Sequence, residues 1–382
     1  MKSVTLITHN LSLGGVQKNV TLLANQLAAN FSIRVVLFES KPIEQSLAKN
    51  VAISFLPEKK LAAAILSKVN PNDTVTVGKQ LFDFRVKCLG QLTDRLGSDL
   101  YISFEDYNNL ISLHAIKLHS PNQRLIISSR VSLEIYRGAL IHLLDKQFYL
   151  TRIAKDYPKA DAVVAVSLGV ARELCGLGLT PTTIQNGIPP LMPVEREPAP
   201  AAARPHFLSV GRMNNRHKGQ SDLLRAYARI AEEVDERLII VGDGPDRDLI
   251  TNLAQQLEMA KRVTITGYDP HPWKDLSQTT AFVFPSFFEG LPNTLLEAMA
   301  LGLPTISYDF TPSCDEILAG GEFGVKVARG DISGLAQAMK AMSHDVAMRQ
   351  RYRRKSLESA KRFDLAATLA KWELLVQGLL EH

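Results

Sequence analysis

Two glutamates, Glu289 and Glu297, lie eight positions apart on either side of a Gly-Leu-Pro turn. The apolar run 281–284 predicts a buried strand, so we expect Glu289 on the strand-to-helix loop and Glu297 about one and a half turns into the next helix. In open α/β sheets such loops present ligands to helix N-terminal amides. Carboxylates accept hydrogen bonds from sugar or ribose hydroxyls, and the amides bind an anion. The pair favours a nucleotide-sugar site, although one glutamate near a helix start can also be a simple cap.

A second loop carries two cations between an expected strand and an expected helix. Gly211-Arg212 is followed six residues later by Lys218-Gly219. Arginine supplies a fork of donors and lysine a point charge, so Arg212 and Lys218 can converge on a diphosphate. The two glycines let the backbone approach such a ligand closely. A basic surface loop is the alternative interpretation.

Two glycine turns follow expected strands elsewhere in the chain. Gly244 lies in a Gly-x-Gly-Pro turn after the run 238–241, and Gly14-Gly15 follows the run 4–8. Each turn precedes a helical pattern, so each places backbone amides at a sheet edge. The first loop lacks the G-x-G-x-x-G spacing, which argues against a nicotinamide cofactor.

These segments together resemble family 4 of the retaining glycosyltransferases, whose E-x7-E motif has the spacing of Glu289 and Glu297. The matches run in the family's order from residue 8 to residue 318 and cover most of the chain. The resemblance implies catalytic roles for Arg212 and Lys218, on the leaving diphosphate, and for Glu289, on the donor sugar. It implies neither a metal ion nor a cofactor. The residues that it implies for donor binding are Gly14, Gly15, Gly211, Gly244, Gly290, Leu291, Asn293 and, on the ribose, Glu297.

The chain departs from the family pattern after the expected strand 125–128. Many members carry a histidine there, whereas this chain reads Ser129-Arg130-Val131. Arg130 is therefore a candidate contact to the sugar or the acceptor, with a structural salt bridge as the alternative.

The order of the apolar runs predicts two domains. Six prolines among the residues 189–205 predict an extended connector. Strand-like runs alternate with helical patterns on both sides of it, which predicts two doubly wound α/β domains with parallel sheets. The resemblance identifies this as the GT-B fold, with residues 1–188 binding the acceptor and 206–363 binding the nucleotide sugar. It also implies that the final helix, 364–382, packs back on the first domain.

Composition limits the functional classes. The chain of 382 residues has 46% hydrophobic and 22% charged content, which is typical of a soluble globular protein. No run is long enough to span a bilayer and no cleavable leader begins the chain, so we expect a cytoplasmic protein. The three cysteines lack metal-ligand spacing and are expected to be buried free thiols.

Positive charge is concentrated in the first half, where residues 1–188 contain 21 lysines and arginines against 14 aspartates and glutamates. Basic and apolar residues alternate over 58–95, which is compatible with a peripheral contact to an anionic membrane, and a solvated surface is the alternative. Aromatic and basic residues do not alternate as in RNA-binding proteins, so no nucleic-acid partner is expected. The basic residues of this segment are Lys59, Lys60, Lys68, Lys79, Arg85, Lys87 and Arg95.

The resemblance implies transfer of a hexose or N-acetylhexosamine from a nucleoside diphosphate sugar, with UDP as the expected nucleotide, and retention of configuration. The expected acceptor is a glycan or lipid-linked hydroxyl in cell-envelope polysaccharide synthesis, such as that of lipopolysaccharide. The alternatives are a sugar-nucleotide epimerase or phosphorylase of the same fold, and a sugar-nucleotide-binding protein without turnover.

Overall fold

The structure is a computed structural model that describes residues 1–12, 14–56, 74–117, 122–134, 146–191, 204–274 and 276–381. Its contacts divide the chain into two compact units, which are Met1–Gly187 with Ala366–His382, and Ile188–Leu365. Most of the expected proline-rich connector, 192–203, lies outside the described residues.

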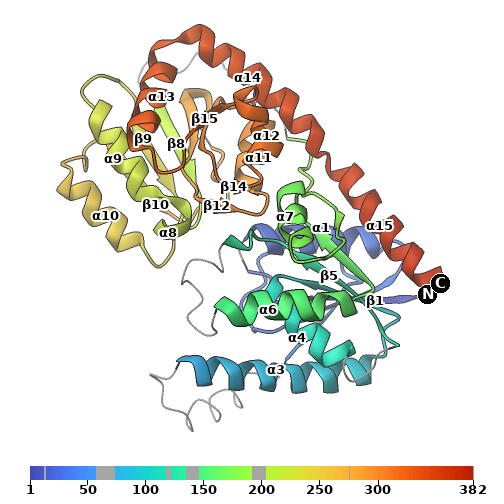
Figure 1. The fold of residues 1–382 in the computed structure, drawn as a ribbon. Coiled ribbons are helices and arrows are strands. Elements are labelled where there is room, and N and C mark those ends of the chain that lie inside the picture. Colours follow the sequence, from blue (N-terminus) through green and yellow to red (C-terminus); the bar gives the residue numbers. More distant parts are fainter. Residues whose placement is uncertain are drawn as a thin grey trace. The chain divides into compact units, whose positions relative to one another are not determined.

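The first unit is built on a parallel sheet of seven strands in the order β3-β2-β1-β4-β5-β6-β7. Figure 1 labels β1 and β5 of this sheet. The central strands are continuous apolar runs because both faces of the sheet are covered. Since the strands are parallel, the carboxyl ends of β1, β4 and β5 meet at one edge. The strands are β1 (Ser3–Thr8), β2 (Ser32–Leu37), β3 (Ala52–Phe55), β4 (Leu100–Phe104), β5 (Arg124–Ser129), β6 (Ala162–Ala165) and β7 (Thr182–Thr183).

Helices cover both faces of this sheet. One face packs on α1 and on the last helix of the chain, α15, whose Trp372 and Val376 are buried in the same core as Val4 and Leu6 of β1. The Trp372 ring lies 5.9 Å from the ring of Phe104. The helices are α1 (Gly15–Leu27), α3 (Thr74–Leu96), α4 (Asp106–Ser112) with the π-helical turn η1 (Leu113–Lys117), α6 (Lys146–Asp156) with the 3-10 turn η2 (Tyr157–Lys159), α7 (Leu168–Cys175) and α15 (Leu365–Glu381).

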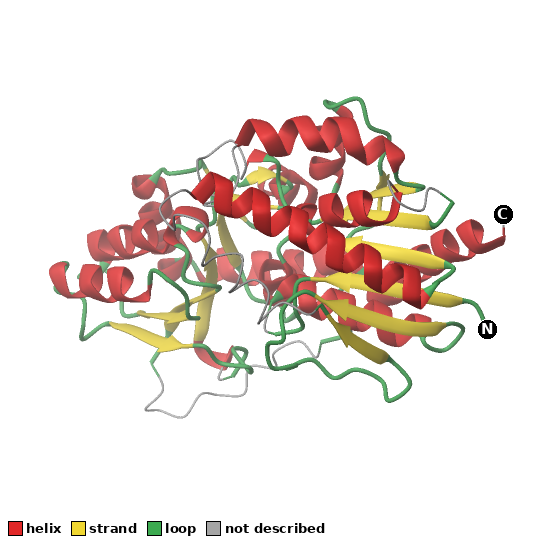
Figure 2. Ribbon diagram, turned by 90° about the horizontal axis from the view of Figure 1, so that it is seen from below, coloured by secondary structure: helices red, strands yellow, loops and turns green. Residues whose placement is uncertain are grey.

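The second unit has a parallel sheet of six strands in the order β10-β9-β8-β11-β13-β15. Figure 2 distinguishes the strands, in yellow, from the helices, in red. A separate pair of two-residue strands, β12 and β14, lies in the loops after β11 and β13. The strands are β8 (His206–Val210), β9 (Arg237–Val241), β10 (Val263–Gly267), β11 (Thr279–Phe284), β12 (Phe288–Glu289), β13 (Thr305–Tyr308), β14 (Thr311–Pro312) and β15 (Val325–Val327).

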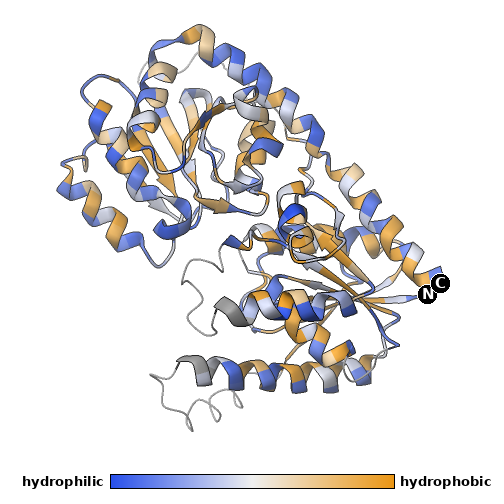
Figure 3. Cartoon of the chain, viewed as in Figure 1, coloured by the Kyte–Doolittle hydropathy of each residue, from blue (hydrophilic) through white to orange (hydrophobic). Residues whose placement is uncertain are grey.

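One face of the second sheet packs on α9, α10 and α13 in a single apolar core. The apolar side chains of α11 are buried as well, and α11 contacts α14 and β11. In Figure 3 the strands are mostly hydrophobic while hydrophilic residues colour the outer helix surfaces. The helices are α8 (Asn215–Lys218), α9 (Gln220–Ile230), α10 (Arg247–Gln256), η3 (Leu276–Gln278), α11 (Asn293–Ala300), α12 (Cys314–Leu318), η4 (Ala319–Gly321), α13 (Ile332–His344), α14 (Val346–Ala360) and η5 (Lys361–Phe363).

The predicted pair of doubly wound parallel sheets is confirmed, and the expected strands 4–8, 125–128, 238–241 and 281–284 are present with ends shifted by at most two residues. The sequence patterns missed the short strands β3, β7 and β15 at sheet edges, and the pair β12 and β14. One expectation for the cysteines is wrong: Cys88 and Cys314 are buried, but Cys175 at the end of α7 is exposed.

The segment 58–95 was expected to present basic and apolar residues to a membrane. The structure describes only its later part, and several of the side chains there are buried. Residues 57–73, with Lys59, Lys60 and Lys68, lie outside the described residues. On α3, Phe82, Phe84 and Leu89 are buried in the unit and so are not available to a bilayer. Arg85 is also buried, with its guanidinium 5.7 Å from the ring centroid of Phe38 and 5.3 Å from that of Tyr107. The exposed cations of α3 are Lys79, Lys87 and Arg95.

None of the helices in the part of the chain that the structure describes is both long and apolar enough to cross a membrane. The same residues contain no group of three or more histidines, cysteines or acidic residues that could hold a metal ion.

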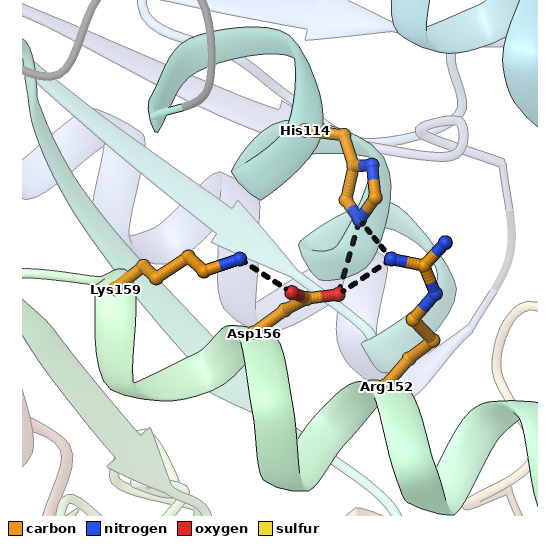
Figure 4. Close-up of polar contacts among 4 residues, drawn as sticks. All are labelled: His114, Arg152, Asp156 and Lys159. Atoms are coloured by element: carbon orange, nitrogen blue, oxygen red, sulfur yellow. Dashed lines mark hydrogen bonds and ion pairs between the residues drawn. The ribbon is translucent and has the colours of Figure 1, made fainter.

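A buried carboxylate fastens α6 to the π-helical turn η1 (Figure 4). The Asp156 side chain is 1% exposed and accepts from His114 at 3.1 Å, Arg152 at 3.2 Å and Lys159 at 2.7 Å. Burial acts to raise the pKa of Asp156, but the bonds and charges of Lys159 and His114 outweigh it and lower that pKa overall. The lowered pKa means that the ionised form stabilises the folded unit.

We expect Asp156→Asn to lower the free energy of unfolding of the first unit by about 2 kcal/mol at neutral pH, because charged hydrogen bonds are lost. The Asp156 contribution is present above the pKa of the unfolded chain and is lost as pH falls through the lower, folded pKa. The difference between the two proteins should therefore shrink in acid. Urea unfolding monitored by Trp372 fluorescence, in a Trp273→Phe background, measures this unit.

The matched control is Lys2→Met, which removes a half-exposed ammonium of the first unit that pairs with Asp99 at 3.3 Å. Such surface pairs contribute about 0 to 1 kcal/mol, so this variant should unfold nearly like the parent. Equal effects of the two substitutions, or an Asp156 effect that does not change with pH, would contradict the assignment.

Candidate functional site

The loop after β8 and the loop after β11 contact each other through their backbones. The amide of Phe287 donates to the carbonyl of His217 at 2.7 Å. Gly219 has a positive φ of 62°, and a Cβ added there would lie 2.2 Å from the carbonyl oxygen of Pro285. Only glycine combines this backbone angle with such a close approach. The two loops are therefore held at a fixed distance at the carboxyl edge of the second sheet.

This contact brings Lys218 and Glu289 together from positions 71 residues apart. The ammonium nitrogen of Lys218 lies 2.5 Å from Oε1 of Glu289 and 5.6 Å from the ring centroid of Phe284. The side chains are 23% and 13% exposed, so the pair is reachable but mostly enclosed. An ammonium carries three donors, and the pair with one carboxylate oxygen leaves capacity for an anion.

Both residues lie in more regular structure than expected. Lys218 is the last residue of the one-turn helix α8, not part of an open loop. Glu289 is in β12, where it pairs with Pro312 of β14, so its backbone is fixed by a neighbouring strand. The side-chain hydroxyl of Ser313 donates to the carbonyl of Glu289 at 3.4 Å. The expected loop positions are therefore corrected to short ordered elements.

His217 precedes Lys218 in α8 and accepts the backbone bond from Phe287, and sequence reasoning missed it. Burial lowers the pKa of His217, and the charges of Lys218, Arg216 and Arg212 also lower it, whereas the charge of Glu289 opposes them. Nε2 of His217 is buried without a hydrogen-bond partner among the described residues. The predicted Arg212, which is exposed, thus lies close enough for its charge to act on the His217 imidazole, as do the charges of Lys218 and Glu289.

Glu297 is on α11, where it is 8% exposed. The indole Nε1 of Trp273, from the loop after β10, donates to Glu297 Oε2 at 3.2 Å. The Trp273 ring packs 5.8 Å from that of Phe282 in β11. The indole therefore orients one carboxylate oxygen, a role that no sequence pattern indicated.

The predicted backbone contacts lie at the same sheet edge. Gly290 and Leu291 are buried directly before α11, and Asn293 is its first residue. A Cβ at Gly244 would lie 2.4 Å from the carbonyl oxygen of Met213, which accounts for glycine in that turn. The amide of Gly211 donates to Val241 at 3.0 Å.

Gly14, Gly15 and Arg130 belong to the first unit. Gly14 precedes α1 in an extended conformation, and its carbonyl accepts from the amide of Lys18 at 3.0 Å. Arg130 follows β5 and is 7% exposed, with Nη2 donating to Oδ1 of Asn186. Burial lowers the pKa of Arg130 to about 10, and the charge of Glu105 opposes that shift.

Comparison with known proteins shows that the second unit is similar to a glycosyltransferase family. Residues 195–359 match the family model described as Glycosyl transferases group 1. A relative from Campylobacter jejuni, N-acetylgalactosamine-N,N'-diacetylbacillosaminyl-diphospho-undecaprenol 4-alpha-N-acetylgalactosaminyltransferase, is 27% identical over 371 residues, which are 95% of this chain and 96% of that protein. The lipopolysaccharide 1,6-galactosyltransferase of Escherichia coli is 31% identical over 185 residues, which are 46% of this chain and 50% of that protein.

Solved structures agree on the fold. Sucrose-phosphate synthase from Thermosynechococcus elongatus has a TM-score of 0.82 and 20% identity, with the whole of both chains covered. Anabaena HepE, solved in complex with UDP and glucose, has a TM-score of 0.73 and 15% identity, with 99% of this chain and 100% of that chain covered. The expected GT-B fold is thereby confirmed, and the match of residues 195–359 to the group 1 model agrees with the expected glycosyltransferase family.

We expect Gly219→Ala to destabilise the second unit because Cβ adds backbone strain and a clash with Pro285. Gly330→Ala is the matched control, since Gly330 has a φ of 79° and no atom within 4 Å of the added Cβ. Strain alone should cost about 1 kcal/mol, and the clash about 1 to 3 kcal/mol more. Trp273 fluorescence during urea unfolding, in a Trp372→Phe background, reports this unit. Equal losses in both variants would contradict the close contact.

Proposed function

We propose that this chain, whose residues 195–359 match the model Glycosyl transferases group 1 and whose fold is GT-B, transfers a hexose or N-acetylhexosamine from a UDP-sugar to a hydroxyl. The proposed acceptor is a glycan or lipid-linked saccharide of cell-envelope polysaccharide synthesis. The names of the Campylobacter and Escherichia relatives support this class of acceptor, and the HepE complex with UDP supports the nucleotide. The observation that carries the proposal is the Lys218–Glu289 pair beside Arg212 at the carboxyl edge of the second sheet.

The difficult step is departure of the diphosphate while positive charge develops at the anomeric carbon. Arg212 and Lys218 would stabilise the negative charge on the diphosphate, together with the amides of Gly290 and Leu291 before α11. Because protein cations supply this charge, we propose a reaction that needs no divalent ion.

The two glutamates would bind and orient the donor. Glu289 would accept from donor-sugar hydroxyls through the oxygen that Lys218 does not use, so one carboxylate would orient both the sugar and the cation. Glu297, whose carboxylate is oriented by the Trp273 indole, would accept from ribose hydroxyls. Front-face attack by the acceptor, with its proton passing to the leaving phosphate, would give retention of configuration without a side-chain base.

We propose that the second unit binds the donor and that the first unit binds the acceptor. A peripheral contact to an anionic membrane would then rest on exposed cations such as Lys79, Lys87 and Arg95, since Phe82, Phe84 and Leu89 of α3 are buried. Such an electrostatic contact would weaken with increasing salt.

Lys218→Ala and Arg212→Ala should each reduce turnover by a factor of about 10² to 10³, because each removes a donor that stabilises developing charge. Release of nucleoside diphosphate from a panel of nucleotide sugars, with EDTA present, measures this. Lys326→Ala is the control, since Lys326 pairs with Asp309 and Asp315 in the same unit. Wild-type rates in both site variants, or loss of all activity in EDTA, would overturn the proposed mechanism.

Glu297→Ala should weaken UDP binding by about ten-fold to a hundred-fold, as expected for lost hydrogen bonds to a carboxylate. Trp273→Phe keeps an aromatic ring but removes the indole donor, so it should weaken UDP binding less. The double variant with Glu297→Ala and Trp273→Phe should bind UDP as weakly as Glu297→Ala alone, because Trp273 affects UDP binding only through Glu297. Calorimetry with UDP measures the four affinities, and Trp372→Phe in the first unit is the control. Unchanged affinity in Glu297→Ala would exclude the ribose role.

A further inference from the structure

Buried polar atoms without partners gather at the carboxyl edge of the sheet in the first unit. They come from the ends of β1 and β5, two strands that flank β4 in the sheet. A buried polar group without a hydrogen bond costs about 1 to 3 kcal/mol, so such a concentration indicates a place where hydrogen-bonding ligand atoms or water are accommodated. The atoms without a partner among the described residues are Thr8 Oγ1, Ser128 Oγ, Ser129 Oγ and Arg130 Nε.

Glu105, directly after β4, is held at the same edge in an unusual backbone conformation. Its φ is 74°, one of three positive values at non-glycine residues in the part of the chain that the structure describes. Such a conformation costs about 1 to 3 kcal/mol and is typical of functional positions. The amide of Glu105 donates to the carbonyl of Ser128 at 3.2 Å, and its carboxylate accepts from Nδ2 of Asn108 at 3.2 Å. The neighbouring strand β5 therefore fixes the position from which the carboxylate projects.

The charges around Glu105 favour an uncharged ligand. Burial and the neighbouring Asp106 raise the pKa of Glu105 to about 7, whereas the charge of Arg130, the Asn108 bond and the His9 amide act to lower it. Asp106 is itself buried and accepts from the Tyr157 hydroxyl at 2.6 Å. One guanidinium beside two carboxylates gives no excess of positive charge, so a phosphate would gain little here. A ligand with hydroxyl groups matches both the acceptor and the donor groups.

We propose that Glu105 and Arg130 form a subsite for the hydroxyl groups of an uncharged sugar ring, with Glu105 accepting and Arg130 donating hydrogen bonds. The subsite rests on the proposed glycosyl transfer and adds Glu105 as a residue that determines which sugar is accepted. Arg130 is oriented for this by Asn186, and its Nε remains for the ligand. The ring can come from the donor sugar or from the acceptor glycan, since both present the same hydroxyl chemistry.

The test uses the full chain and its Glu105→Gln and Arg130→Lys variants. Glu105→Gln keeps the size of the side chain and removes the carboxylate, and Arg130→Lys keeps the charge and removes the fork. Saturation-transfer NMR with methyl glycosides of glucose, galactose, N-acetylglucosamine and N-acetylgalactosamine measures sugar binding, and inorganic phosphate is the anionic probe. We expect at least one glycoside to bind the parent and to bind either variant about ten-fold to a hundred-fold more weakly.

Asp99→Asn is the matched control, because Asp99 lies at the opposite end of β4, where it accepts from the amide and hydroxyl of Ser3. It should leave glycoside binding unchanged. Circular dichroism and urea unfolding verify that each variant is folded. Glycoside binding that is equal in the parent and both folded variants would overturn the subsite, and so would displacement of the bound glycoside by inorganic phosphate.

Two further measurements identify the source of the ring. If the ring belongs to the donor, Glu105→Gln will weaken binding of the nucleotide sugar and leave binding of free UDP unchanged. If it belongs to the acceptor, hydrolysis of the nucleotide sugar will be unchanged while the KM for the acceptor increases. Glycoside binding that depends on Glu105 in a protein that neither hydrolyses nor transfers any nucleotide sugar would support the subsite and refute the proposed function.

Discussion

The site in the second unit depends on one backbone contact, in which the loop after β8 lies directly against the loop after β11. The bond from the Phe287 amide to the His217 carbonyl sets the distance, and Gly219 makes it sterically possible. Lys218 and Glu289 lie on the two sides of this contact. The backbone contact therefore sets the distance between them, and their pairing does not depend on a flexible search by the side chains. Short ordered elements, α8 and β12, then limit the movement of each residue.

The sequence was sufficient to predict the two sheets, because buried parallel strands are continuous apolar runs that differ clearly from the patterns of the helices between them. The strands that it did not predict are β3, β7 and β15 at the sheet edges and the pair β12 and β14, which are two to four residues long. A strand of two residues has no periodicity to detect. It forms because a neighbouring segment offers backbone partners, and that depends on tertiary structure.

The candidate site likewise contains residues that local sequence patterns predict and residues whose roles depend on tertiary structure. Residue types and spacing were sufficient to select Arg212, Lys218, Glu289 and Glu297, since glycine turns and charged residues at strand ends are local patterns. The roles of His217 and Trp273 depend on which loops meet at the sheet edge, and no local pattern carries that information. Glu105 was missed for another reason: its backbone angle is positive although its residue type gives no sign of it.

The first unit is discontinuous in sequence, and this has a consequence for synthesis of the chain. Trp372 and Val376 of α15 fill the core beside β1 and β4, which are made more than 260 residues earlier. The second unit lies wholly between these two parts, so all of its residues leave the ribosome before the last core residues of the first unit do. One face of the sheet in the first unit therefore stays incompletely covered until α15 has been synthesised. A chaperone that binds the growing chain would bind this exposed apolar face rather than the second unit.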